Sequence, residues 1–133
     1  MSLPGRMVVT ELIGIYDADG GWQGELSYFV GHLLGRRQCS LCDITNSPLR
    51  RKESWDAMTA GLGVPFALLH RDERPPDVAS ATGDRVPTVL ARLESGELLA
   101  LLTPGELDEI QGDVAAFRDR LLAALKVRSI SLP

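Results

Sequence analysis

Residues 86–102 read V-P-T-V-L-A-R-L-E-S-G-E-L-L-A-L-L, in which a polar, glycine-containing turn separates two apolar runs. Two apolar runs joined by a turn of this length are typical of an antiparallel hairpin. The stretch therefore predicts paired strands over 87–93 and 98–102, with a proline at the start of the first.

The N-terminal half of the chain supplies two more strands. Residues 8–16 are mostly apolar and β-branched and stop at the turn-prone run D-A-D-G-G (17–21), which predicts a strand in the middle of a sheet. Residues 64–70 form a short apolar run that ends before the charged residues 71–73. A run of this kind is typical of a buried strand, here one that carries His70 at its carboxyl end.

Three helices follow from apolar residues at helical spacing. The pattern predicts helices over 22–35, 48–62 and 113–126, the last capped by Asp113. Thr103 and Glu106 have the spacing of a capping box and predict a short helix between the hairpin and the last helix. These elements together describe an α/β domain with a mixed four-stranded sheet flanked by helices.

The length and net charge of the chain limit the kinds of protein that it can be and the partners that it can bind. A chain of 133 residues fits one domain over 1–133, and we expect tails at 1–7 and 127–133. It has neither an apolar run of the ~20 residues that cross a bilayer nor the apolar middle of a signal peptide, so we expect a cytoplasmic protein that does not bind membranes. The net charge of −4 predicts no nucleic-acid partner, because clustered cations supply that affinity.

The order strand, helix, strand, hairpin, helix, with V-P-T-V-L at 86–90 and S-G-E-L at 95–98, resembles that of thioredoxin-like domains. The resemblance implies that the strand after Pro87 runs antiparallel to the first strand, with a cis proline beside the first strand's end. The family's redox cysteines follow the first strand, where this chain has G-G-W-Q at 20–23. The resemblance therefore implies a binding or interaction module for an unknown protein or small molecule, not a conventional thioredoxin. A homodimer stays open.

The two cysteines form one C-x-x-C motif, Cys39 and Cys42, and three interpretations compete. The pair is two reduced thiols in a loop or partly buried, a redox dithiol activated by nearby arginines, or part of a zinc site. In the zinc site His32 is the best third ligand, and Asp43 and His70 are further candidates. No other cofactor is expected. If the helix over 22–35 is straight, the motif lies roughly 20 Å from the bend after the first strand.

A second group of side chains surrounds that bend. Carboxyl ends of parallel strands and nearby helix N-termini form ligand sites in α/β sheets, so residues from three loops are expected to meet there. The predicted ligand-binding residues are Asp17, Asp19, Gly20, Gly21, Trp22, His70, Asp72, Arg85 and Pro87. The alternative is that the aspartates and glycines only form the turn and cap a helix.

The D-x-D-G run that begins at Asp17 also resembles the first motif of haloacid-dehalogenase-type phosphatases. That resemblance implies Asp17 as the nucleophile, Asp19 as the acid/base and a magnesium ion between them. The sequence thus leaves a small magnesium-dependent phosphatase as a third hypothesis, beside the binding module and the thiol or metal protein.

Overall fold

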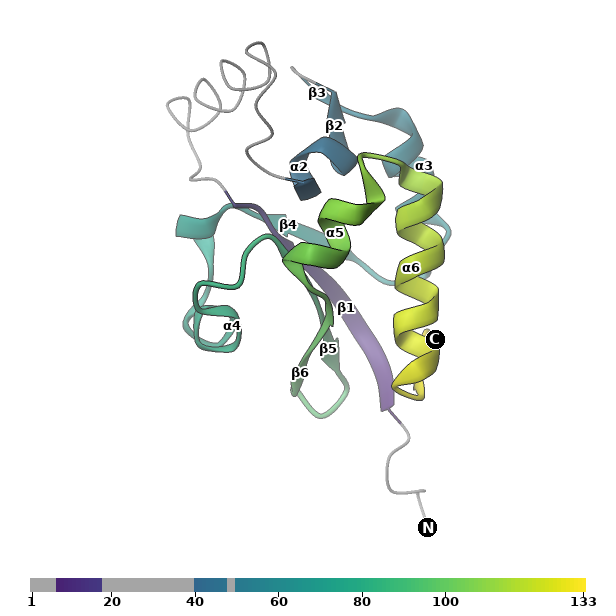
Figure 1. The fold of residues 1–133 in the computed structure, drawn as a ribbon. Helices are drawn as coiled ribbons and strands as arrows, with labels where there is room; N and C mark the ends of the chain where they lie inside the picture. The colour runs from purple at the N-terminus through teal and green to yellow at the C-terminus, as the bar shows by residue number, and fades with distance from the viewer. Residues whose placement is uncertain (1–6, 18–39, 48–49) are drawn as a thin grey trace.

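The structure, a computed structural model, describes residues 7–17, 40–47 and 50–133 (Figure 1). Its main sheet has the strand order β4-β1-β5-β6, and β7 pairs with the beginning of β1. The strands are β1 (Met7–Ile15), β4 (Phe66–Leu69), β5 (Thr88–Leu93), β6 (Leu98–Leu102) and β7 (Ile130–Ser131). The α/β class, the four predicted strands and the central place of the first strand are confirmed.

The strand directions also follow the prediction. β1 is parallel to β4 and antiparallel to β5, and β5 is antiparallel to β6. Ile15 lies opposite both Leu69 of β4 and Thr88 of β5. The start of β5 therefore lies beside the end of β1.

The predicted C-terminal tail is wrong in part. β7 pairs with β1 in parallel, with Met7 opposite Ile130, and the Ile130 side chain is buried. A strand of two residues is too short to produce an alternating pattern, so local sequence could not distinguish it from a tail.

The helical elements lie around this sheet, and three of them were not predicted. The elements are α2 (Ser40–Thr45), α3 (Glu53–Ala60), the 3-10 helix η1 (Arg71–Glu73), α4 (Pro76–Thr82), α5 (Pro104–Ile110) and α6 (Val114–Val127). The three that were not predicted are α2, η1 and α4. The helix predicted over 48–62 begins only at Glu53, because β2 (Asn46–Ser47) and β3 (Arg50–Arg51) pair just before it. The helix predicted over 22–35 lies outside the described residues.

Local capping explains where α5 and α6 begin. The Thr103 hydroxyl accepts a hydrogen bond from the Glu106 N–H at 3.1 Å, and the Glu106 carboxylate accepts one from the Thr103 N–H at 3.0 Å. This reciprocal pair is the predicted capping box, and it lowers the pKa of Glu106, chiefly through the Thr103 backbone bond. Asp113 caps α6 by accepting from the Ala116 N–H at 3.1 Å.

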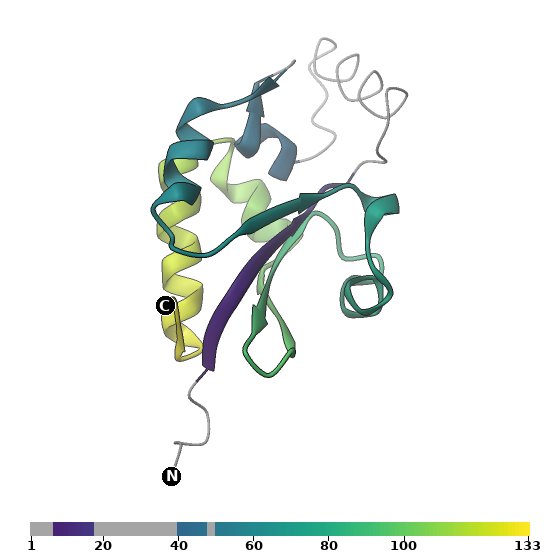
Figure 2. The ribbon, with the colours of Figure 1, turned by 180° about the vertical axis from the view of Figure 1, so that it is seen from behind.

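The helices lie on the two faces of the sheet. Figures 1 and 2 show α4 on one face, and α2, α3, α5 and α6 on the other. The larger apolar core lies under the four helices and includes Leu12, Leu41, Trp55 and Phe117, whereas Val78 of α4 packs with Ile13 and Ile15. Among the described helices, none has the length and apolar content that crossing a bilayer requires.

Candidate functional site

Three chain segments meet where β1 and β4 end and β5 begins. Because Ile15 is opposite Leu69 and Thr88, the neighbouring residues Tyr16, His70 and Pro87 adjoin the same edge of the sheet. The Val86–Pro87 peptide bond is cis, as the thioredoxin-like resemblance implies. We call this edge the rim and define it by Tyr16, Asp17, His70, Arg71 and Pro87.

Contacts between β1 and β4 hold the rim side chains together. The Tyr16 N–H donates to the Leu69 carbonyl at 2.8 Å, which extends the parallel pairing past the end of β1. The rings of Tyr16 and His70 lie 5.2 Å apart, and Arg71 Nη1 donates to Asp17 Oδ1 at 3.2 Å. The Asp17 and Arg71 side chains are 37% and 43% exposed, so a ligand can reach both members of this ion pair.

The turn after β4 fixes the His70 imidazole. Glu73 Oε1 accepts a hydrogen bond from the His70 N–H at 2.7 Å and lies 2.9 Å from His70 Nδ1. The backbone bond is the main cause of a lowered Glu73 pKa, and the ring contact adds to it. The lowered pKa means that ionised Glu73 stabilises the fold at neutral pH, and this contribution is lost as the pH falls through the lowered pKa. The contact with Glu73 thus involves Nδ1 and not Nε2 of the ring.

The structure brings together several of the predicted ligand-binding residues. Asp17 and His70 are at the rim, as expected from the parallel pairing of β1 with β4, and Pro87 is there because β5 runs antiparallel to β1. Asp72 is exposed in η1, and Arg85 is exposed two residues before Pro87, where its Nη2 donates to the Ala81 carbonyl at 2.8 Å. The other members of the predicted set lie outside the described residues: Asp19, Gly20, Gly21 and Trp22. Asp19 is also the acid/base of the phosphatase hypothesis.

Sequence reasoning missed Tyr16 and Arg71 as rim residues. The sequence pattern places Tyr16 in the first strand and Arg71 in the charged run that ends the second. Both could have been predicted from their positions, because Tyr16 directly precedes Asp17 and Arg71 directly follows His70.

The segment that carries Cys42 packs on the end of β1. Cys42 lies in α2, only 5% exposed, and Thr45 at the end of this helix has its hydroxyl 2.8 Å from the Tyr16 hydroxyl. A Cβ added to Gly14 of β1 would lie 3.1 Å from Leu41 Cδ2, so α2 also packs on the second half of β1. Leu41 and Thr45, on either side of Cys42, thus bring α2 against Gly14 and Tyr16. The bend at 20–23 lies outside the described residues, so the separation of roughly 20 Å between it and the cysteine motif stays a prediction.

The other candidate ligands of the thiol and zinc hypotheses are described only in part. Cys39 and His32 lie outside the described residues, the Asp43 side chain is not described, and His70 lies at the rim. Within the described part of the chain, no three His, Cys, Asp or Glu side chains are grouped closely enough to hold a metal ion.

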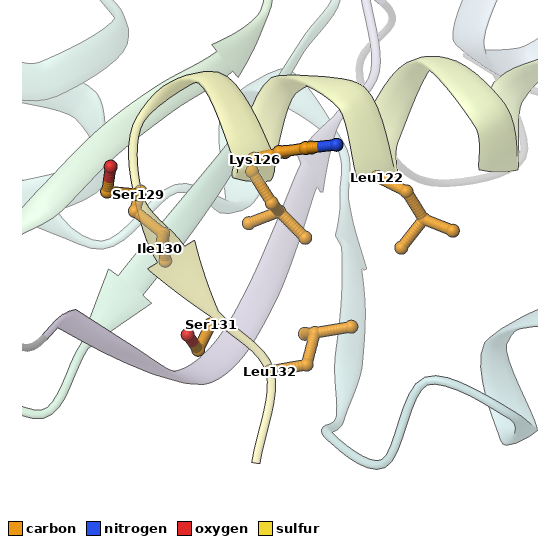
Figure 3. Close-up of a pocket in the computed structure, with 7 residues that line it drawn as sticks. Leu122, Lys126, Ser129, Ile130, Ser131 and Leu132 are labelled. Atoms are coloured by element: carbon orange, nitrogen blue, oxygen red, sulfur yellow. The ribbon is translucent and has the colours of Figure 1, made fainter.

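A shallow groove lies at the opposite end of β1, where β7 pairs with Met7 and Val8 (Figure 3). Its volume is about 480 Å³, and its walls come from the end of α6 and from β7. The lining residues are Leu122, Leu125, Lys126, Ser129, Ile130, Ser131 and Leu132. None of them belongs to the rim, so the groove is a separate feature of the surface.

Comparisons with known proteins give no match: no family model, no curated protein and no solved structure is significantly similar to this chain.

Proposed function

We propose that this chain is a thioredoxin-like domain that binds a protein segment or a small molecule at the rim. The observation that carries the proposal is the meeting of Asp17, His70 and Arg71 at one edge of the sheet, where β1 and β4 end. Ligand sites in α/β proteins favour the carboxyl ends of parallel strands, because the loops there are exposed while the sheet holds them in place. The antiparallel pairing of β5 with β1, which the thioredoxin-like resemblance implies, supports the proposal.

The rim side chains are already oriented before a ligand arrives. Asp17 and Arg71 hold each other at 3.2 Å, and Glu73 holds the His70 ring. Ordering side chains on binding costs free energy, so groups that are fixed in advance favour affinity. A carboxylate, a guanidinium and an imidazole side by side suit a ligand that both donates and accepts hydrogen bonds.

A photo-crosslinking amino acid at position 85 tests this proposal. Arg85 is exposed beside the rim and Glu97 is exposed in the turn between β5 and β6, at the other end of the hairpin. We expect a covalent adduct from the probe at 85 in a cell extract, none from the probe at 97, and a several-fold lower yield when Arg71→Gln is added. Mass spectrometry would show whether the adduct is a protein or a small molecule.

Two results would contradict the binding proposal. Equal adduct yields from positions 85 and 97 would show that capture is nonspecific. No adduct from position 85 or from a second probe at Asp72 would show that the rim binds nothing in the extract.

A second candidate function is thiol chemistry at Cys39 and Cys42, and the position of α2 favours it. α2, which carries Cys42, packs on β1 through Leu41 and Thr45, and the resemblance implies redox chemistry just after this strand. A dithiol acting as a reductant would form the Cys39–Cys42 S–S bond while the S–S bond of a disulfide substrate breaks, and its two electrons and two thiol protons would pass to the substrate's two sulfur atoms. Cys42 is buried, so Cys39 would be the attacking thiolate in this reaction.

Thiol titration and metal analysis of protein purified without chelator test the second candidate. A redox pair is expected to give two titratable thiols after reduction and none after treatment with oxidised glutathione. Bound zinc would instead support the metal interpretation. Two thiols that stay reduced and carry no metal would exclude both.

A further inference from the structure

We propose that the Tyr16 side chain holds α2 on the sheet, so that the Cys42 thiol reacts with solvent reagents only when α2 opens locally. Groups at the rim control this opening. The contact that holds α2, which we call the Tyr16 latch, is the hydrogen bond between the Tyr16 and Thr45 hydroxyls, 2.8 Å long and buried. The control by the rim rests on the proposed binding function, whereas the latch itself does not.

The Thr45 hydroxyl takes part in a second hydrogen bond besides the one with Tyr16. The Thr45 hydroxyl donates to the Cys42 carbonyl at 3.4 Å, within α2. Either hydroxyl can be the donor in the bond between Tyr16 and Thr45. Tyr16, Cys42 and Thr45 are at most 6% exposed, and all three side chains become accessible together if α2 leaves the sheet.

α2 needs this support because it is too short to be stable alone. It has six residues, and isolated helices below about 12 residues are marginal in water. It is anchored by the Leu41 and Ile44 side chains, both fully buried, and by the Tyr16 latch, and it also packs against α5 and α6. Losing one buried hydrogen bond of this kind should change the opening equilibrium roughly tenfold.

Tyr16 also belongs to the rim, which connects the two regions. Its ring lies 5.2 Å from the His70 ring, and its N–H is bonded to the Leu69 carbonyl. A group that holds His70 in place therefore also holds Tyr16 in place, and through it α2. By thermodynamic linkage, a ligand or contact that favours the Tyr16–Thr45 hydrogen bond also lowers the rate at which the Cys42 thiol reacts with solvent reagents.

Native-state labelling of Cys42 tests the latch. In a Cys39→Ser background, Cys42 is the sole cysteine, and its reaction with a thiol reagent is followed at increasing urea. We expect Tyr16→Phe and Thr45→Val each to raise the labelling rate without urea roughly tenfold, and the double variant to be no faster than either one. The control is Thr88→Val, which removes another buried hydroxyl bond, 2.8 Å to the Leu102 carbonyl, and should leave that rate unchanged.

The same measurement can overturn the proposal. If wild-type labelling depends on urea as steeply as global unfolding does, or if Thr88→Val accelerates it as much as Tyr16→Phe, α2 does not open by itself. His70→Ala tests the rim: a labelling rate raised at least threefold supports control by the rim, and an unchanged rate refutes that control while leaving the latch. Cys39→Ala repeats the series in case the serine variant folds poorly. Failure of the binding proposal would appear in the crosslinking yields, not in these rates.

Discussion

Replacing Phe117 with alanine is expected to lower the free energy of unfolding by about 3–5 kcal/mol. Phe117 of α6 is fully buried, and its ring centroid lies 5.0 Å from that of Trp55 in α3 and 6.1 Å from that of Phe66 in β4. Truncation would leave a cavity where α3 and α6 meet the sheet, and both aromatic contacts would be lost. Urea denaturation followed by circular dichroism measures the effect.

Val127→Ala is the matched control for this substitution. Val127 lies on the same helix but is 81% exposed, so its truncation should change the free energy of unfolding by less than about 0.5 kcal/mol. A loss below 1 kcal/mol for Phe117→Ala would mean that the aromatic cluster is not the centre of the core.

Local patterns predicted the long elements of this fold because their apolar residues repeat over several turns or pleats. The strands over 8–16 and 87–93 and the helix over 113–126 have such repeats, and the structure has all three. α4 was missed because Val78 and Thr82 are its only fully buried residues, too few to form a stripe. The sequence does indicate α4 by Pro76 at its first position, but proline is common both at the start of a helix and in loops.

The rim was predictable in part because strand direction brings distant residues together. Once 8–16 and 64–70 are parallel neighbours, Asp17 and His70 must adjoin the same edge, and the structure has them there. The return of α2 to that edge was not predictable from local patterns. Sequence distance between Tyr16 and Thr45 sets only an upper limit on their separation in space, and the tertiary contacts of Leu41 and Thr45 determine where α2 lies.

A substitution at Gly14 is expected to disturb both the sheet and α2. A Cβ at this position would lie 3.0 Å from Leu68 Cδ2, 3.1 Å from Leu41 Cδ2 and 3.2 Å from Phe66 Cε1. These distances are shorter than ordinary van der Waals contacts, and the two γ-methyl groups of valine would crowd the site further. Gly14→Val should therefore lower the free energy of unfolding by about 1–3 kcal/mol, measured by urea denaturation.

Gly105→Ala in α5 is the control, because a Cβ there meets nothing closer than the Thr103 hydroxyl at 4.0 Å. This variant should be neutral or up to about 1 kcal/mol more stable, since alanine favours a helix.

Leu41 is one of the three side chains that Gly14→Val would push, so Gly14→Val should also accelerate the labelling of Cys42. Unchanged labelling together with lost stability would mean that Leu68 and Phe66 absorb the crowding, and that Gly14 is required for the contact between β1 and β4 and not for the docking of α2.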